Sequence, residues 1–356
     1  MEFIENVRLS DDGLSVIIID QTLLPGEEKC LTLSEAEEFR EAIITLRVRG
    51  APAIGIFAAY ALYVLAKRSA AVNYAEFYAD VARYAEYLDS ARPTAVNLSA
   101  QLKRMVALTE RMADAQVHRI LDAMRAEAVK IHEEDIAMCK AISENGFNIL
   151  RDGMADADNG ADFTRGRFSI MTICNAGPLA TSRYGTALGP ILLGHERGMK
   201  LHVFCCETRP LLQGARLTAF ELSRAGVDCT LICDSMAGIV MKEGKVGAVF
   251  VGCDRIARNG DTANKVGTGS LAVLAKHYGI PFYVFGPSST LDPDCGNGAE
   301  IEIELRPPGE IKEMFFCRPV APEDVKCYNP SFDVTDSELI TAIVTEKGVF
   351  RFPYSF

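Results

Sequence analysis

Short segments that are apolar throughout constrain the fold of this chain more than any other feature, and they lie in its second half. Stretches of helical period separate them. The segments are Phe168–Ile173, Leu201–Phe204, Cys229–Cys233, Ala248–Gly252 and Phe282–Phe285. Strands that alternate with helices and are apolar on both faces are typical of a parallel sheet covered by helices on both sides. The sequence therefore predicts a doubly wound α/β domain.

The first part of the chain carries a different pattern, in which helical periods follow one short alternating segment. Leu14–Ile19 is predicted to be a strand, and Ser34 is a good N-cap for the first helix, with Glu37 placed for a capping box. The helices are expected at Glu35–Leu46, Pro52–Lys67, Tyr74–Leu88, Val96–Ala113 and Gln116–Leu150.

A polar stretch rich in Asp, Gly and Asn, Arg151–Arg167, separates the two patterns. Such stretches are typical of loops and domain boundaries. We therefore expect a mostly helical N-terminal domain over residues 1–150 and an α/β domain over residues 151–356.

Polar residues gather where the predicted strands end. The clusters are Cys174-Asn175-Ala176-Gly177, Glu207-Thr208-Arg209-Pro210, Asp234-Ser235, Asp254-Arg255 and Ser288-Ser289-Thr290. In open α/β sheets, ligands bind outside the carboxyl ends of the strands. The clusters are therefore expected to converge on one active-site crevice.

Two of these residues, Cys174 and Asp254, have the chemistry of proton transfer. Cys174 lies between a buried strand and a helix start, a position that activates a thiol as a nucleophile or base. Asp254 follows an apolar run, and a carboxyl group in an apolar pocket suits a proton donor. A packed core cysteine, and a helix cap or an ion pair with Arg255, remain the structural alternatives.

Cationic segments offer candidate anion sites. Arg47–Pro52 leads directly into an apolar helix, whose free N–H groups and neighbouring Arg49 would attract a phosphate. Arg92–Asn97 follows the same logic but is a weak motif, and a rigid turn explains it better. Asn264 and Lys265 follow a tight turn and could place a donor and a cation on a phosphate or hydroxyl.

The composition excludes several classes of protein. A net charge of −11 lacks the basic surplus of nucleic-acid binders. The 11 cysteines include no C-x-x-C pair, so neither a disulfide framework nor a zinc site is expected. The acidic N-terminus predicts no signal peptide, and Ala51–Ala66 is shorter than the roughly 20 residues that span a bilayer. We expect a cytoplasmic protein with no metal and no membrane partner.

Several segments of the chain resemble the methylthioribose-1-phosphate isomerases, the enzymatic branch of a superfamily shared with regulatory subunits of the translation initiation exchange factor. They are RVRGAPAIGI, RPTAVNL, CNAGPLAT, ETRPLLQGARLTAFEL, VGCDRIARNGDTANKVGT, GIPFYVFGPSSTLD and NPSFDVT. The resemblance runs from about Asp20 to an expected C-terminal helix at Lys347. It implies a helical N-terminal domain and a Rossmann-like α/β domain, usually as a homodimer.

The resemblance also implies the site. Its catalytic residues fall on Cys174 and Asp254. Its substrate contacts fall on Arg49, Gly50, Ala51, Arg92, Gln213, Asn264 and Lys265. Asp254 would protonate the ring oxygen of an aldose 1-phosphate, and Cys174 would carry a proton between C2 and C1. A direct hydride shift from C2 to C1 is the competing scheme, and neither scheme needs a metal or organic cofactor.

Some residues near the implied pocket depart from the family pattern and leave the 5-substituent of the sugar open. They are Ile173 for His, Cys206 for Asp, Ser235 for Asn, Cys253 for Ala and Gly269 for Tyr. The leading substrate is 5-methylthioribose 1-phosphate, and 5-deoxyribose 1-phosphate and ribose 1,5-bisphosphate are alternatives. A non-catalytic, sugar-phosphate-binding regulatory subunit is the third possibility, but it would not need the acid–thiol pair.

Overall fold

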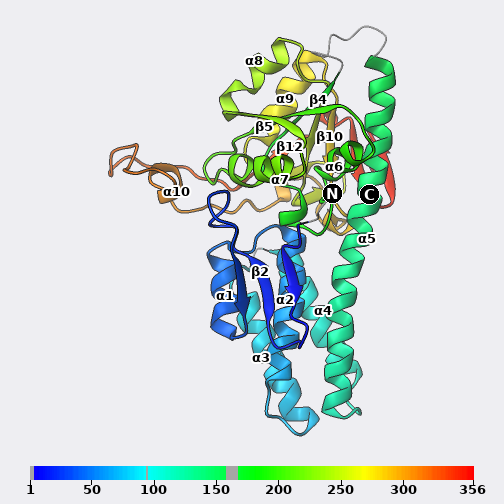
Figure 1. Cartoon of the computed structure of the whole chain (residues 1–356), viewed down its shortest axis with the longest axis vertical. Helices are drawn as coiled ribbons and strands as arrows, with labels where there is room; N and C mark the ends of the chain where they lie inside the picture. Colours follow the sequence, from blue (N-terminus) through cyan, green and yellow to red (C-terminus); the bar gives the residue numbers. More distant parts are fainter. Residues whose placement is uncertain (1–3, 94, 158–166) are drawn as a thin grey trace. The chain divides into compact units, whose positions relative to one another are not determined.

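The computed structural model describes residues 4–93, 95–157 and 167–356 (Figure 1). Its contacts divide the chain into two compact units. The helical unit holds the described residues up to 137 together with the short segment 178–183. The α/β unit holds residues 138–177 and 184–356, apart from those outside the description.

The division between the units falls inside helix α5 (Val117–Ala157) rather than at the predicted boundary of 150/151. Ile120 and Ile131 on this helix belong to the core of the helical unit. Ile142 and Leu150 belong to the core of the α/β unit. The polar composition after residue 150 therefore marks the end of the helix and not the change in packing.

The helical unit combines a small antiparallel sheet with helices. Its elements are β1 (Val7–Leu9), β2 (Val16–Ile19), β3 (Cys30–Leu33), α1 (Ala36–Ile44), α2 (Ala51–Lys67), α3 (Tyr74–Asp89), α4 (Val96–Arg111) and the first part of α5. Helix α2 is the centre of the core, because every residue from 53 to 66 is buried. The predicted cap of α1 is wrong by one residue: Glu35 is the N-cap, and Glu38 completes the capping box.

The α/β unit is built on a seven-stranded sheet with the order β14-β13-β10-β7-β4-β5-β6. The strands are β4 (Phe168–Thr172), β5 (Leu201–Cys206), β6 (Asp228–Ile232), β7 (Ala248–Val251), β10 (Phe282–Phe285), β13 (Ala342–Thr345) and β14 (Gly348–Arg351). All pairs are parallel except β13 with β14. Each predicted apolar segment is a strand, so the doubly wound fold is confirmed.

Helices cover both faces of this sheet. On one face, Val249 packs in a core with Leu271 of α9 (Thr268–Tyr278), and α8 (Ala237–Lys242) contributes to the same core. On the other face, Phe250 packs in a core with residues of α5, α6 (Gly189–Glu196) and α7 (Ala219–Arg224). Strand order reverses between β4 and β7, and this switch point is where doubly wound folds bind their ligands.

Two features of the α/β unit differ from the prediction. A second sheet of order β11-β8-β9-β12 comprises β8 (Arg255–Ala257), β9 (Thr262–Lys265), β11 (Leu291–Asp292) and β12 (Phe332–Thr335). The expected C-terminal helix at Lys347 is wrong, because Lys347 lies in the turn that joins β13 to β14. The β-branched residues Ile343, Val344 and Val349 favour strands at this position.

Helix α10 (Gly309–Lys312) belongs to a segment that extends away from the rest of the α/β unit (Figure 1). In the part of the chain that the structure describes, no helix combines the length and apolar character needed to cross a membrane.

Candidate active site

Cys174 lies at the tip of β4 in a backbone turn that fixes its main chain from both sides. Its φ is +64°, an uncommon value for a residue other than glycine. Its N–H donates to Oγ1 of Thr208 at 2.8 Å, and its carbonyl accepts from Oγ1 of Thr218 at 2.6 Å. The side chain is half-buried. Because both peptide groups are engaged, the thiol is the group of Cys174 that remains for chemistry.

The tips of β4 and β7 and the end of β9 lie against one another. A Cβ on Gly252 would sit 2.9 Å from Cβ of Ala176 and 4.0 Å from Oδ1 of Asn264. A Cβ on Gly267 would sit 2.9 Å from Cδ1 of Ile173. The structure therefore brings together the segments that carry Cys174 and Asp254, which the strand ends predicted, and the segment that carries Asn264, which they did not.

Asp254 is held in this group of segments by its backbone, whose N–H donates to the carbonyl of Ala263 at 2.9 Å. The predicted apolar surroundings are not observed, because the Asp254 side chain is exposed. Cys253 takes the inward direction instead, with its thiol near Oγ1 of Thr290 at 3.4 Å. The alternative role predicted for Asp254 was an ion pair with Arg255. Arg255 instead forms an ion pair with Asp292 at 3.5 Å.

Gln213 lies in the segment after β5. This segment continues as a π-helical turn, Gly214–Thr218. Gln213 is 6% exposed, and its Oε1 accepts no hydrogen bond from the described residues. An unpaired buried amide oxygen is costly, and π-helical turns are frequent at functional sites.

Asn264 and Lys265 lie at the end of β9, in the sheet that the sequence did not predict. The buried amide of Asn264 donates to Oγ1 of Thr268 at 3.0 Å. Nζ of Lys265 lies 4.5 Å from the ring centroid of Phe332. Asp333 on β12, opposite Asn264, accepts the N–H groups of Gly267 and Gly269, and burial raises its pKa. This carboxylate shapes the turn after Lys265.

The other predicted contacts lie in the helical unit. Gly50 is the N-cap of α2 with a φ of +94°, and a Cβ there would lie 2.3 Å from the carbonyl oxygen of Ala180. Only glycine fits this position, and it places Arg49 before the free N–H groups that begin at Ala51. Arg92 is half-buried between α3 and α4. Thr94 of its motif lies outside the described residues.

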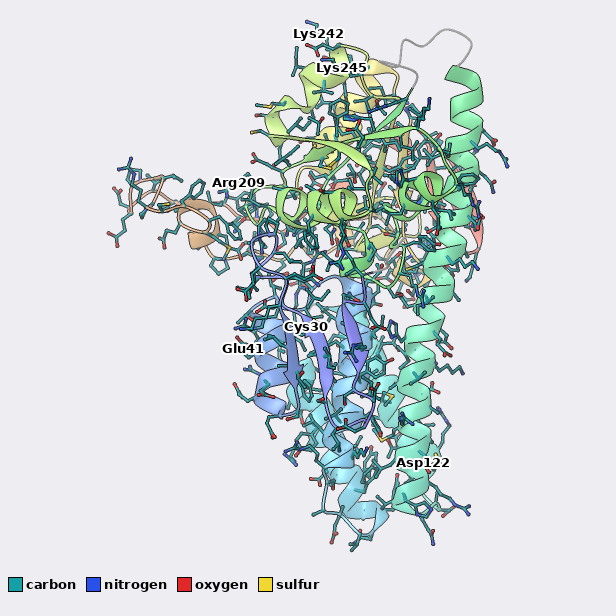
Figure 2. All side chains as sticks on the ribbon, in the orientation of Figure 1. Cys30, Glu41, Asp122, Arg209, Lys242 and Lys245 are labelled. Atoms are coloured by element: carbon teal, nitrogen blue, oxygen red, sulfur yellow. The ribbon has the colours of Figure 1, made fainter. Side chains whose placement is uncertain are left out.

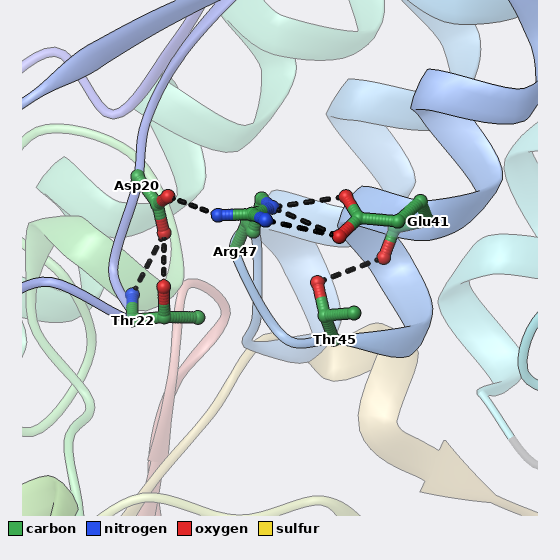
Figure 3. A network of polar contacts seen from close by, with 5 residues as sticks. All are labelled: Asp20, Thr22, Glu41, Thr45 and Arg47. Carbon is green, nitrogen blue, oxygen red and sulfur yellow. Dashed lines mark hydrogen bonds and ion pairs between the residues drawn. The ribbon is translucent and has the colours of Figure 1, made fainter.

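An ion-pair network that the sequence did not indicate surrounds Arg47, two residues before Arg49 (Figure 3). Arg47 bonds the carboxylate of Asp20, and its Nε donates to Glu41 at 2.9 Å. Asp20 also accepts the N–H and Oγ1–H of Thr22 at 3.0 and 2.6 Å. The network ties the segment before α2 to β2 and α1.

We expect Arg47→Met to lower the free energy of unfolding by about 2 kcal/mol, because it leaves the buried carboxylate of Asp20 without its cation. The Asp20 side chain is 2% exposed and that of Arg47 is 31% exposed, so the loss is smaller than for a fully buried pair. Urea unfolding measures it. Arg68→Met is the matched control: its pair with Glu35 is exposed, and the change should cost less than about 1 kcal/mol. Equal free energies of unfolding for the two variants would contradict a stabilising role for the ion pair between Arg47 and Asp20.

Arginines of the segment after β5 bind the segment that carries α10, a contact absent from the prediction. Nη2 of Arg209 donates to the carbonyl of Ile311 at 2.8 Å, and its guanidinium lies 5.0 Å from the ring of Phe316. Arg216 lies 4.6 Å from the ring of Phe315. Figure 2 labels Arg209 on the side of the α/β unit from which this segment extends.

Thiols of the α/β unit differ sharply in their ionisation. Burial raises the pKa of Cys206 and of Cys253 to about 12. A hydrogen bond between Cys205 and Cys229 raises the pKa of the first, and lowers that of the second to about 7. Alkylation requires the thiolate, so thiols of high pKa are unreactive.

Iodoacetamide at neutral pH should therefore modify Cys229 while Cys205, Cys206 and Cys253 stay protected. Cys229 should react faster as the pH rises through about 7, because its thiolate predominates above that value. Peptide mass spectrometry of the native protein measures each site, and the urea-unfolded chain is the control in which all sites react. Labelling of Cys206 or Cys253 at the unfolded rate would contradict their burial.

The α/β unit thus has the organisation of an enzyme for a small substrate, with a thiol and a carboxylate at the switch point of a doubly wound sheet. Residues 47–352 match the model of the Initiation factor 2 subunit family, and the chain belongs to that family.

Similar proteins place the chain among the isomerases of this family. The methylthioribose-1-phosphate isomerase of Symbiobacterium thermophilum is 55% identical over 99% of this chain and 94% of that protein. The 5-deoxyribose 1-phosphate isomerase of Petrotoga mobilis is 53% identical over 98% and 96%. The crystal structure of 5-methylthioribose 1-phosphate isomerase from Pyrococcus horikoshii has a TM-score of 0.89 at 40% identity, covering 98% of this chain and 93% of that one.

Proposed function

We propose that the chain is an aldose–ketose isomerase that converts 5-methylthioribose 1-phosphate to 5-methylthioribulose 1-phosphate in methionine salvage. The observation that carries the proposal is the placement of Cys174 in its clamped turn at the tip of β4, next to β7, the strand that Asp254 follows. The 55% identity with a methylthioribose-1-phosphate isomerase supports the choice of substrate.

The chemistry begins with ring opening, because the phosphate ester on C1 blocks the free aldehyde that ordinary sugar isomerases use. Asp254 donates a proton to the ring oxygen as the bond from C1 to that oxygen breaks. Cys174 then removes the proton from C2 and returns it to C1, through an enolate-like intermediate. The hydroxyl on C2 loses its proton to Asp254 and becomes the ketone, so both catalytic groups end as they began.

A hydride shift from C2 to C1 gives the same product without using Cys174 as a base. Reaction in deuterium oxide addresses the choice, because solvent deuterium at C1 requires proton transfer through an exchangeable group. Absence of deuterium is compatible with a hydride shift and with a proton that is shielded from solvent.

Gln213, Asn264 and Lys265 are proposed substrate contacts in the α/β unit. The unpaired Oε1 of Gln213 suits a sugar hydroxyl, and Lys265 supplies a positive charge. The family resemblance assigns further substrate contacts to the helical unit, and these stay predictions: Arg49, Gly50, Ala51 and Arg92.

Relatives at 55% and 53% identity carry the names of isomerases for two sugars that differ in the 5-substituent. Activity on each sugar therefore has to be compared directly. We expect kcat/KM for 5-methylthioribose 1-phosphate to exceed that for 5-deoxyribose 1-phosphate by about tenfold or more, since each added apolar group in a pocket is worth about 10- to 200-fold. Steady-state assays with both sugars and with ribose 1,5-bisphosphate measure this. A preference for another of these sugars would replace the substrate but keep the reaction, and turnover of none would support the regulatory subunit.

We also propose that the protein acts in the cytoplasm as a homodimer. All 11 cysteines are free thiols, which suits a reducing compartment. The dimer follows from the family resemblance, and light scattering of the purified chain would test it.

A further inference from the structure

Asp234 follows β6, and its carboxylate binds the turn at the end of the neighbouring strand β5. Oδ1 accepts the N–H of Thr208 at 2.8 Å, and Oδ2 accepts the N–H of Arg209 at 2.7 Å. Strands β5 and β6 are parallel neighbours, so their tips meet at the same edge of the sheet. Hydrogen bonds from two successive N–H groups to one carboxylate are charge-assisted and define the orientation of the turn.

Thr208 carries this constraint to the tip of β4. It is fully buried, and its Oγ1 donates to the carbonyl of Cys206 at 2.9 Å while accepting the N–H of Cys174 at 2.8 Å. Its φ is +69°, which is strained for a β-branched residue. Such a conformation persists only where the surroundings hold it, and the bonds from Asp234 do so.

The direction of the Cys174 thiol depends on this turn. With a φ of +64°, Cys174 points its side chain differently from a residue that continues the strand. Thr208 clamps its N–H and Thr218 clamps its carbonyl, so neither peptide group can rotate without breaking a hydrogen bond.

We propose that Asp234 and Thr208 are positioning residues that hold the thiol of Cys174 in its reactive orientation. The proposal rests on the proposed function, in which this thiol transfers the proton. Asp234 contributes through the Thr208 turn rather than as a proton donor or acceptor for the sugar.

Asp234→Asn tests the first link. The amide keeps the shape of the carboxylate but sets an N–H₂ group against one of the two N–H donors, so one hydrogen bond is lost. A displacement of about 1 Å in a reacting group can cost about a hundredfold in rate, so we expect kcat to fall by about 10- to 100-fold with little change in KM. Asp228→Asn is the matched control, since Asp228 begins the same strand, at the opposite end, in an exposed ion pair with Arg167. It should keep the kcat of the native chain.

Thr208→Val and Thr208→Ser test the second link. Valine keeps the shape but removes the oxygen that binds Cys174, and serine restores this oxygen without the second branch. We expect kcat to fall for the valine variant and to return toward the native value for the serine variant. This pair decides the question if Asp234→Asn fails to fold.

The rate at which iodoacetamide alkylates Cys174, followed by peptide mass spectrometry on the full chain, reports the thiol independently of turnover. It should change in Asp234→Asn and Thr208→Val, but not in Asp228→Asn or Thr208→Ser. Native kcat and native Cys174 alkylation in both Asp234→Asn and Thr208→Val would overturn the proposal. If the native chain turned over no sugar 1-phosphate, the proposed function would fail, and the alkylation rates alone would still decide the positioning role.

Discussion

Replacing Cys174 with serine is expected to lower kcat for the isomerisation by about 10²- to 10⁴-fold, the range typical for loss of a general acid–base group. A serine hydroxyl holds its proton far more tightly than a thiol does, so it cannot accept the proton from C2. The fold should survive, because the hydrogen bonds of Cys174 to Thr208 and Thr218 use its main chain. Steady-state assay of ketose formation, with circular dichroism as the test of folding, measures both effects.

Cys229→Ser is the matched control for this variant, because Cys229 is a half-buried thiol within β6 and has no role in the proposed reaction. It should retain the native kcat. A Cys174→Ser variant within tenfold of the native rate would remove the proton-transfer role from Cys174 and favour the hydride shift.

Replacing Asp254 with asparagine is expected to cause a loss of similar size, about 10²- to 10⁴-fold in kcat. An amide of the same shape cannot protonate the ring oxygen, and the sugar 1-phosphate then stays closed. The exposed side chain and the retained bond from the Asp254 N–H to the carbonyl of Ala263 indicate that the variant should fold. The same steady-state assay applies.

Asp292→Asn provides the comparison for Asp254. Asp292 is a nearby carboxylate whose ion pair with Arg255 is half-exposed, so its loss should leave kcat near the native value. If Asp254→Asn and Asp292→Asn retained equal activity, another group would have to supply the proton.

Most of the large parallel sheet could be predicted because its central strands, such as β4 and β7, are buried throughout, so each of them reads as a continuous apolar run. The second sheet could not, because its strands include polar segments such as Thr262–Lys265. Their pairing joins distant residues, for example Lys265 with Phe332. Strands β13 and β14 were also missed. They form a short hairpin, and no stretch of helical period separates the two strands, so the pattern that indicated the other strands is absent.

The candidate site likewise has features that could be predicted from the sequence and features that could not. Strand ends indicated Cys174 and Asp254, because the chain order of a parallel sheet places these ends at one edge. The clusters at Thr208 and Asp234 were visible, but their function depends on hydrogen bonds between residues 34 and 26 positions apart. Asp254 departs from the expected apolar surroundings because its side chain is exposed, while the thiol of the preceding Cys253 lies near Oγ1 of Thr290.

¹³C NMR of the pure protein with 5-methylthioribose 1-phosphate labelled at C1 would show whether the chain isomerises a 5-modified ribose 1-phosphate. We predict that the signal of the anomeric carbon disappears and that a phosphorylated CH₂ signal grows with enzyme concentration, with no added metal or cofactor. An unchanged anomeric signal, for this sugar and for its 5-deoxy analogue and ribose 1,5-bisphosphate, would contradict the assignment of the chain as an enzyme of this reaction.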